Sequence, residues 1–498
     1  MDFMRSHRFY LVLVALVAVA VYAPLFGAFY CGFDDFTFTH RAAFEDRQNP
    51  SHIFTTTHGV SAKYRPVERL LDYAVYRASN GNALGFRIRN LVGLLGTGAM
   101  LYILGFYLFG SKEIAFAAAL LFTLHPLANQ ATAAALFTIA PAAFILLASL
   151  VLLVYAPQTK HWELWLFGSL LCLGLSLFIY EAGIVMLALW AVFVVVKRPP
   201  RRFLVALGLG LAVVLGIFFT ARATFVHSPP EHGTIGTIIK NLVLFGGGIL
   251  AAPADSILAH DVFGAPLPSE MSFGDASFLI PVGTGVATLL ALALLLGRRM
   301  WRNDFAEPFP RFRLALVAAS IPLWLVPFLA FTPHASETYL YLPACSASLF
   351  MAAFLAYTLK SHRAFSVVVG VLAVIFGTST LNRNLHVLKT GKIAEHIIKS
   401  FPLDAWRHGT WNIRVAEADP PLPRYGLYNY RGLSTIDLGD PAVPATEFAL
   451  QVATGNPGVS VRVLPAWEMA ATPCAEPQLC YWVYADGTVL QTPVSQTH

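Results

Sequence analysis

The sequence is short of charged residues. Asp, Glu, Lys and Arg make up only 12% of its 498 residues, whereas 56% are hydrophobic and the mean hydropathy is +0.61. Soluble domains usually carry about 25% charged residues, so this composition excludes an ordinary soluble protein. The net charge of +6 is scattered at the ends of apolar runs, which is not a nucleic-acid-binding pattern. We therefore expect no nucleic-acid partner.

Cysteine is also scarce, with five residues in the chain. Neither the cysteines nor the histidines show the spacing of metal ligands. Cys172 and Cys345 lie in apolar runs, which is typical of packing residues, and Cys31 has no obvious partner. Cys474 and Cys480 are close together in the polar tail, and they are disulfide candidates if the tail lies outside the reducing cytosol. The sequence has no internal repeat and no low-complexity tract.

Long apolar runs, in contrast, are abundant. A helix needs about 20 apolar residues to cross a bilayer, and eleven runs come near that length. They are residues 9–27, 91–110, 114–131, 133–155, 163–180, 182–197, 203–222, 278–297, 313–331, 341–360 and 364–381. Arg5 and Arg8 precede the first run, but a convincing small-residue cleavage site is missing, so we interpret it as a retained signal anchor. The fold class predicted is an α-helical polytopic membrane protein.

The basic residues of the short loops orient these spans. Cations such as Lys112, Arg201 and Arg298 fall on one side, which the positive-inside rule assigns to the cytoplasm. The N-terminus then lies in the cytoplasm, and the tail lies in the periplasm of a bacterial inner membrane. Four segments face outward, and these are residues 28–90, 224–277, 332–340 and 382–498. Within the second, the apolar stretch 236–254 is interpreted as a re-entrant or interfacial helix.

The outward segments carry predictions of their own. Apolar residues at three- and four-residue spacing predict an amphipathic helix over 66–78, lying in the membrane interface. The chain after the last span predicts a helix over 383–400, then short strands. The strands are expected at 448–452, 459–464 and 481–489, the last with a turn at Ala485-Asp486-Gly487. We thus expect a membrane domain over 1–381 and a small periplasmic α+β domain over 382–498.

The candidate chemistry lies in the first outward segment, at Asp34 and Asp35. They follow the first span by a few residues, at a membrane boundary where carboxylates are costly to desolvate and usually functional. One carboxylate can take part in proton transfer, and acids together with cations at a bilayer surface suggest chemistry on a lipid-linked phosphate. The other can orient a substrate, raise the pKa of the first by like-charge repulsion, or hold a divalent cation, for which Asp35 is the candidate. The structural alternative is that these residues cap a helix.

A cationic group follows in the same segment, at Lys63-Tyr64-Arg65. Fixed cations stabilise the charge that grows on a phosphate leaving group, and an arginine fork can bind phosphate oxygens in two places. Arg65 and Arg222 are therefore the main phosphate-binding candidates, with Lys63 as a weaker one. The alternatives are an ion pair between Arg65 and Glu68, and snorkelling of Arg222 at the end of its span. The excess of cations in this segment also suggests contact with membrane lipid headgroups.

Six stretches, taken in order, carry a family resemblance. They are Phe33-Asp34-Asp35, Lys63-Tyr64-Arg65-Pro66-Val67, Leu124-His125-Pro126 with Ala131, Glu181-Ala182-Gly183, Arg222, and Ser336-Glu337-Thr338-Tyr339-Leu340-Tyr341-Leu342-Pro343. The chain resembles the GT-C membrane glycosyltransferases, and most of all the multipass half of the transmembrane-and-TPR protein O-mannosyltransferases, over residues 1 to about 380. It departs from them in lacking TPR repeats and in having Thr338 where the family tends to have arginine.

The resemblance implies an inverting transfer from a polyprenyl-phosphate sugar to a hydroxyl on a protein, lipid or glycan, with Asp34 favoured as the base and Tyr64 near the donor. It also implies that His125, Glu181, Glu337 and Tyr339 line the site. Each has a structural alternative. His125 can bind a freed helix carbonyl, Glu181 can bind a loop cation or be solvated, and tyrosine is at home in the interface. No cofactor is implied beyond the divalent cation.

Two other classes of function compete with this one. A flippase or transporter would need charged or broken helices at mid-membrane, whereas these spans are nearly free of charge. A non-enzymatic membrane scaffold would not need the paired acids and the cations. The sequence therefore favours a polyprenyl-phosphate-sugar-dependent glycosyltransferase with a GT-C-like fold.

Overall fold

The computed structural model describes residues 2–30, 33–56, 64–226, 309–331, 337–359, 361–418, 445–471, 474, 478–484 and 486–492, together with residue 238. Several predictions fall elsewhere. The span at 278–297, the side chain of Lys63 and Cys31 lie outside the described residues, as does the stretch 236–254 apart from residue 238.

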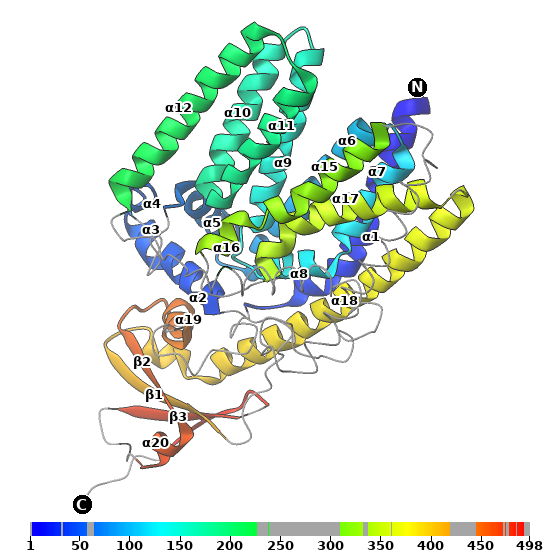
Figure 1. Ribbon diagram of the computed structural model, residues 1–498. Coiled ribbons are helices and arrows are strands. Elements are labelled where there is room, and N and C mark those ends of the chain that lie inside the picture. The colour runs from blue at the N-terminus through cyan, green and yellow to red at the C-terminus, as the bar shows by residue number, and fades with distance from the viewer. Residues whose placement is uncertain are drawn as a thin grey trace, which may run out of the picture.

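A bundle of long helices makes up most of the molecule, with a small sheet domain at one end (Figure 1). The long helices are α1 (Asp2–Tyr22), α6 (Ala83–Phe109), α9 (Ile139–Tyr155), α10 (Trp162–Ile179), α12 (Arg201–Phe225), α17 (Tyr341–Thr358) and α18 (His362–Ser400). Seven described helical stretches are long and apolar enough to cross a membrane, or eight if one bent pair counts as a span. The chain is thus a multi-pass membrane protein with a helical fold, as predicted.

Two of the predicted spans are shorter than expected. At 182–197 a 3₁₀ turn, η4 (Glu181–Val185), precedes a helix of 12 residues, α11 (Met186–Lys197). At 313–331 the chain breaks between α15 (Phe309–Leu323) and α16 (Val326–Phe331). Neither stretch supplies one unbroken helix of the length that a bilayer requires.

The bent pair consists of α7 (Lys112–Thr123) and α8 (Pro126–Ala133), at an angle of 56°. Pro126 explains the break, because proline lacks an N–H and disfavours helical backbone in the residue before it. The carbonyl of Leu124, which the break frees, accepts from Thr380 Oγ1 of α18 at 2.8 Å, and Arg383 Nη1 of α18 donates to Pro126 O in the first turn of α8 at 3.1 Å. These backbone groups at the break therefore have hydrogen-bond partners inside the protein.

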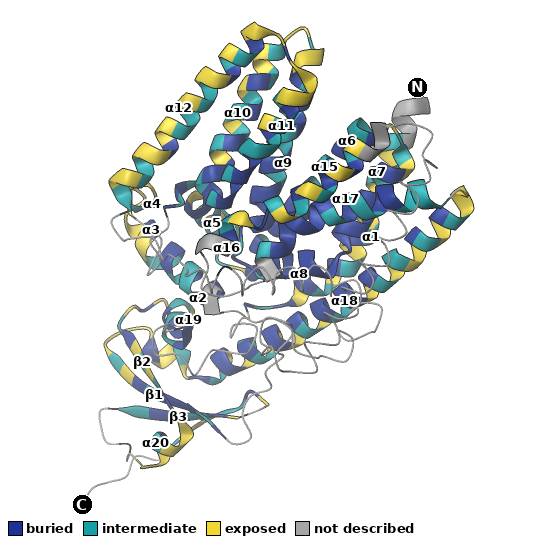
Figure 2. Ribbon diagram, in the orientation of Figure 1, coloured by how far each residue is buried: buried dark blue, intermediate teal, exposed yellow. Residues whose placement is uncertain are grey.

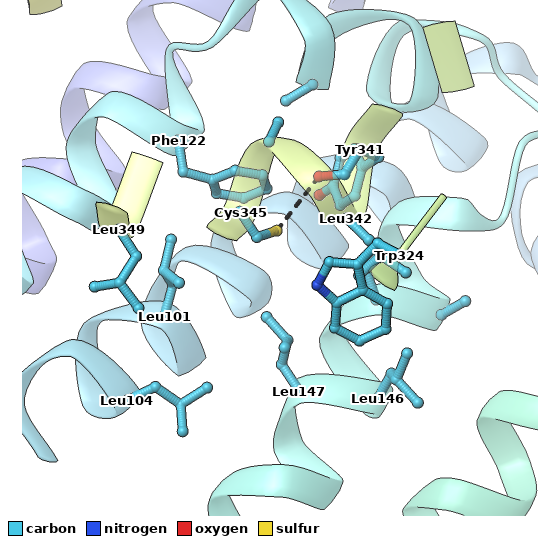
Figure 3. Close-up of a cluster of buried hydrophobic side chains, with 14 of the residues drawn as sticks. Leu101, Leu104, Phe122, Leu146, Leu147, Trp324, Tyr341, Leu342, Cys345 and Leu349 are labelled. Carbon is cyan, nitrogen blue, oxygen red and sulfur yellow. Dashed lines mark hydrogen bonds between the residues drawn. The ribbon is translucent and has the colours of Figure 1, made fainter. Parts of the chain in front are cut away.

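Packing separates an internal core from a lipid-facing surface. The main core lies between α6, α7, α9 and α17, where Leu101, Phe122, Leu146 and Cys345 meet (Figure 3). The outer side of α12 is different: Leu209, Val213 and Ile217 are 57–66% exposed (Figure 2). Apolar side chains exposed along a helix of this length are what contact with lipid requires.

The segment between α1 and α6 folds into short helices under the bundle. They are α2 (Phe33–His40), the π-helix η2 (Arg41–Glu45), α3 (Asp46–Gln48), α4 (His52–Thr55) and α5 (Pro66–Ser79). The predicted helix at 66–78 is confirmed as α5, but only Arg77 of its four charged side chains is exposed. Glu68, Arg69 and Asp72 are 1–4% exposed, while Leu70 is 42% exposed. Buried charges persist when they are paired, and these are paired, as described below.

The tail is an α+β domain, as predicted. Its sheet has the order β2-β1-β3-β4, formed by β1 (Trp411–Glu417), β2 (Val459–Leu464), β3 (Leu479–Val483) and β4 (Val489–Gln491). β1 is parallel to β2 and β3, with Val415 opposite both Val463 and Tyr481, and β3 is antiparallel to β4. The strand at 459–464 and the hairpin near 486–487 are confirmed, and Gly487 has a φ of +90° in that turn.

One predicted strand of the tail is wrong. Residues 448–452 lie in a helix, α19 (Ala445–Thr454), in which the pairs Ala445 with Ala449 and Thr446 with Leu450 are buried at four-residue spacing, as on one face of a helix. The strand β1 was not predicted. The second tail helix is α20 (Ala466–Ala471).

The tail domain packs against the start of the bundle. A second core cluster joins Tyr30, Phe36 and Leu136 to Ile397, Trp406 and Tyr481. His40 of α2 stacks on Phe448 of α19 at 4.2 Å between ring centroids. The helix α18 runs unbroken from the bundle to this domain and crosses the predicted boundary at 381–382 (Figure 1). The helix that bears Asp34 and Asp35 therefore lies between the bundle and the tail.

Candidate functional site

The acidic pair lies in α2. Asp35 is 2% exposed, and its Oδ1 accepts a hydrogen bond from the Leu136 backbone N–H at 3.1 Å. That bond reaches 101 residues along the chain, so this oxygen does not cap the helix in which it stands. Asp34 occupies the second position of α2, and its side chain is outside the described part of the structure.

Leu136 belongs to the connection between α8 and α9, residues 134–138, which we name the connecting loop. Its backbone is buried and needs partners, which come from α6. Asn90 Nδ2 donates to Ala134 O at 2.7 Å, and Arg89 Nη2 donates to Ala135 O at 3.1 Å. The N–H that binds Asp35 is therefore held in a fixed position.

Arg65 lies just before α5 and has two carboxylate partners. Its Nε donates to Glu181 Oε2 at 2.7 Å, and its Nη1 lies 3.5 Å from Glu68 Oε2. The guanidinium carbon lies 4.9 Å from the ring centroid of Tyr180, a cation–π contact. Burial by itself lowers the pKa of Arg65, but Glu181 and Glu68 more than offset this effect and raise the pKa above its usual value.

This cluster answers two questions that the sequence left open. The ion pair between Arg65 and Glu68 is present, and Glu181 binds a loop cation. One guanidinium and two carboxylates carry a net charge of minus one. Within the described part of the chain, Arg65 uses Nε and Nη1 for these contacts, which leaves N–H groups on the fork for another acceptor.

The connecting loop also meets this cluster. Thr138 Oγ1 donates to Glu68 Oε1 at 2.6 Å, two residues after the N–H that binds Asp35. From these bonds and the reach of two residues, Glu68 Oε1 and Asp35 Oδ1 lie within roughly 16 Å of each other. The acid and the cation are thus tied to one short loop.

Two aromatic groups lie near Arg65, one at its chain neighbour Tyr64 and one at Tyr180, whose ring it contacts. Tyr64 donates from its hydroxyl to Phe54 O at 2.8 Å and stacks on Phe225 at 4.8 Å, and burial raises the pKa of its phenol. Phe328 stacks between Tyr180, whose ring contacts Arg65, at 6.0 Å and Tyr339 at 4.4 Å. Glu181 thus contacts Arg65 directly, whereas Tyr339 is connected to it only through Phe328 and Tyr180, and the roles of these residues stay predictions.

Three other candidates are placed less directly. Arg222 is partly exposed on α12, one turn before Phe225, which places it at the helix end that contacts Tyr64. Glu337 lies in the 3₁₀ turn η6 (Glu337–Leu340), with its side chain outside the described part. His125 is 2% exposed, and its Nδ1 accepts from the Leu127 N–H at 3.2 Å. His125 therefore caps α8; it accepts at a helix N-terminus rather than donating to a freed carbonyl.

A buried ion-pair network, not predicted from the sequence, supports the site. Arg69 Nε donates to Asp46 Oδ1 at 2.6 Å, Arg89 pairs with Asp72, and Arg41 Nη2 lies 3.6 Å from Asp72 Oδ2. Burial raises the pKa of Asp72 to about 6, although Arg89 and Arg41 act in the opposite direction. Three loop cations thus bind acids inside the protein, so lipid headgroups are not needed to explain them. The sequence did contain an indication of this network, because charged residues share one side of α5.

No group of three His, Cys, Asp or Glu side chains that could hold a metal ion occurs among the described residues. Asp35 already accepts a backbone hydrogen bond. The donor set around Asp35 therefore does not itself indicate a divalent cation, and that cation stays a prediction.

In the tail, Cys474 and Cys480 form a disulfide, with their Cα atoms 6.2 Å apart. Cys345 is a buried free thiol and Cys172 a partly buried one, in keeping with their interpretation as packing residues. Cys474 also packs with Met469 and Leu464 in a small core beneath the sheet.

Comparison with known proteins gives no match to a protein-family model and none to a curated protein. Among solved structures, the chain is similar to the archaeal oligosaccharyltransferase AglB from Archaeoglobus fulgidus, in complex with an inhibitory peptide and a dolichol-phosphate. The identity is 12%, the TM-score is 0.47, and the match covers 93% of this chain but only 64% of that one.

The chain is also similar to ArnT from Cupriavidus metallidurans bound to undecaprenyl phosphate, at 18% identity and a TM-score of 0.44, with 95% of this chain and 92% of that one covered. The apo state of the same protein gives 14% identity, a TM-score of 0.40 and coverages of 96% and 93%. Because these identities and scores are low, the proposals below rest on the residues of this chain.

Proposed function

We propose that this protein is a membrane glycosyltransferase that moves a sugar from a polyprenyl-phosphate donor to a hydroxyl acceptor. One observation carries the proposal. Asp35 and Arg65 come from distant positions in the outward segment, and both are tied to the connecting loop, through Leu136 and through Glu68 with Thr138. A buried carboxylate and a cation held together at one end of a membrane bundle suit acid–base chemistry on a phosphate-linked substrate.

The reaction needs one base and one stabilised leaving group. The acceptor oxygen forms a bond to the anomeric carbon while the bond from that carbon to the phosphate oxygen breaks. The carboxylate takes the hydroxyl proton, and the polyprenyl phosphate leaves with the electron pair. A single displacement of this kind inverts the anomeric centre. Asp34 is the proposed base, and Asp35, with one oxygen held by Leu136, is proposed to orient the acceptor.

The phosphate requires more positive charge than Arg65 supplies. With Glu68 and Glu181 in contact, the net charge at Arg65 is minus one, so this cluster alone does not attract an anion. Arg222, placed one turn from the ring that stacks on Tyr64, is proposed to add the second cation. Lys63 is proposed to add a third. A bidentate arginine contact then fixes the phosphate in place.

The proposed orientation is supported by chemistry at the tail. A disulfide persists in oxidising compartments, and Cys474 and Cys480 are joined. Together with the basic short loops, this favours a tail in the periplasm of a bacterial inner membrane, with the N-terminus in the cytoplasm. The site, whose helix α2 lies between the bundle and the tail, then faces outward, where lipid-linked sugars and membrane lipids are its neighbours.

A transporter of lipid carriers is the second candidate, because broken helices are typical of transport sites and the span of α7 and α8 is broken. In this protein, however, the carbonyls of Leu124 and Pro126 already bind Thr380 and Arg383 of α18. These two carbonyls are therefore not available to bind a transported substrate, which favours an enzyme over a transporter.

The test uses purified protein in detergent and a panel of labelled polyprenyl-phosphate sugars, with membrane extract as the source of acceptor. Release of free polyprenyl phosphate is measured for the wild type, Asp34→Asn and Asp35→Asn, and gel filtration checks that each variant is folded. The matched control is Glu395→Gln, a residue in an exposed ion pair with Lys399 on α18. Release by the wild type and the control alone supports the proposal. Equal release by all four proteins would remove the acids from the chemistry, and no release with any donor would overturn the proposal.

A further inference from the structure

Glu68 is a buried carboxylate with partners on two sides. It is 4% exposed. Its Oε1 accepts from Thr138 Oγ1 at 2.6 Å, and its Oε2 lies 3.5 Å from Arg65 Nη1. A buried carboxylate is costly unless it is both paired and hydrogen-bonded, and Glu68 is both. Its position is therefore strongly determined by the two groups that it joins.

Those two groups belong to different parts of the site. Arg65 is the proposed phosphate contact, whereas Thr138 ends the connecting loop, whose Leu136 N–H holds Asp35 at 3.1 Å. Thr138 is 2% exposed, and Asp35 is 2% exposed. A continuous series of contacts thus runs from Arg65 through Glu68 and Thr138 to the backbone that binds Asp35.

Glu181 offers a comparison within the same cluster. It binds the same guanidinium, at 2.7 Å, but its side chain is 30% exposed and it approaches from η4 rather than from the loop side. Removal of Glu181 changes the charge at Arg65 while leaving the Glu68–Thr138 bond in place. Removal of Glu68 or of the Thr138 hydroxyl breaks the connection to Asp35.

We propose that Glu68 is a positioning residue, which fixes the phosphate-binding cation and the acidic pair in one relative geometry through Thr138. This role rests on the proposed function. Its advantage is physical: holding reacting groups in register removes orientational freedom that the transition state would otherwise have to lose, and a displacement of about 1 Å can cost up to about 100-fold in rate. In this role Glu68 acts through Arg65 and Thr138, the two residues that it contacts.

The kinetic test uses Thr138→Val, which keeps the side-chain shape and removes the hydroxyl, with Thr138→Ser as the conservative variant. For Thr138→Val we expect kcat to fall about tenfold or more while the KM for the donor stays within about twofold. Thr138→Ser should restore most of the rate. Arg65→Lys should instead raise the donor KM, since a lysine lacks the fork. Glu395→Gln on the surface of α18 serves as the control.

A second readout does not depend on turnover. Amide hydrogen exchange of the peptide that contains Leu136 reports whether the connecting loop is held. Exchange should become faster in Thr138→Val and in Glu68→Gln, and it should stay at the wild-type rate in Glu181→Gln. If Thr138→Val does not fold, Glu68→Gln carries both measurements.

The outcomes separate the inference from the proposed function. No turnover of any donor by the wild type overturns the proposed function and this role with it. Turnover by the wild type, with Thr138→Val equal to it in kcat, leaves the proposed function standing and overturns the role of Glu68. Unchanged exchange at Leu136 in both variants overturns it as well.

Discussion

Arg65 Nε donates to Glu181 Oε2 at 2.7 Å, although the two residues are 116 positions apart in the chain. The contact joins the segment after the first span to the turn between α10 and α11, so it fixes one wall of the site to the bundle. Glu181 is partly exposed, whereas Glu68, the second carboxylate partner of Arg65, is buried. The two glutamates therefore have different consequences for function.

Neutralising Glu181 is expected to strengthen donor binding. Glu181→Gln changes the net charge around Arg65 from minus one to zero, and this removes repulsion of the donor phosphate. Because the carboxylate is partly exposed and screened, the donor KM should fall by only about two- to fivefold, and the difference should shrink as salt is added. Steady-state kinetics at low and high ionic strength measure both effects. A higher KM in Glu181→Gln would mean that Glu181 orients Arg65 rather than competing with the phosphate.

Removal of Asp72 is expected to destabilise the fold. Asp72 pairs with both Arg89 and Arg41, all three buried or nearly so. Asp72→Asn leaves Arg89 without its carboxylate and leaves Arg41 with Asp46 alone, 3.8 Å away; breaking a buried pair of this kind costs about 3–5 kcal/mol. The exposed pair of Lys399 and Glu395 gives the control, since Lys399→Gln should cost only about 0.3–0.5 kcal/mol. Thermal unfolding in detergent measures both. Similar melting temperatures for the two variants would contradict the assigned role of the network.

The disulfide predicts the orientation of the tail. If the tail is periplasmic, Cys474 and Cys480 should resist alkylation in intact cells until a reductant is added, because the disulfide that joins them persists in an oxidising compartment. Reduction should then destabilise the tail by about 2 kcal/mol, as expected for a loop of this length. Mass spectrometry of alkylated peptides gives the measurement, and buried Cys345 provides an internal control. Alkylation of both tail cysteines without reductant would place the tail in a reducing compartment.

The contact of His40 with Phe448 predicts that the tail supports the acidic pair. The rings stack at 4.2 Å, and His40 ends the helix that carries Asp34 and Asp35. Phe448→Ala should destabilise the packing of the tail against α2 by about 1 kcal/mol for the lost ring pair, and by more if the space left by the ring stays open. Limited proteolysis should then cut the tail faster, and the transfer rate should fall. Faster cleavage with an unchanged rate would show that the tail does not position α2.

Local pattern was enough for a large part of this architecture. Apolar runs of bilayer length predict the membrane helices from α1 to α18, because a span must satisfy its backbone and its lipid contacts by itself. Alternation and turn residues located β2 and the hairpin at Gly487. Proximity of Cys474 and Cys480 in sequence was enough to suggest their disulfide. These features depend on residues within one short stretch, so the sequence contains them.

Only the tertiary structure decided the partners of the charged residues. The burial of Glu68, Arg69 and Asp72 in α5 contradicts its amphipathic pattern, since their pairing partners lie on other elements. The same holds for the link from Arg65 through Glu68 and Thr138 to Asp35, which joins α2, α5 and the connecting loop. The physical reason is general: a buried charge is stable only where its partner is, and no sequence pattern records which distant residue folds against it.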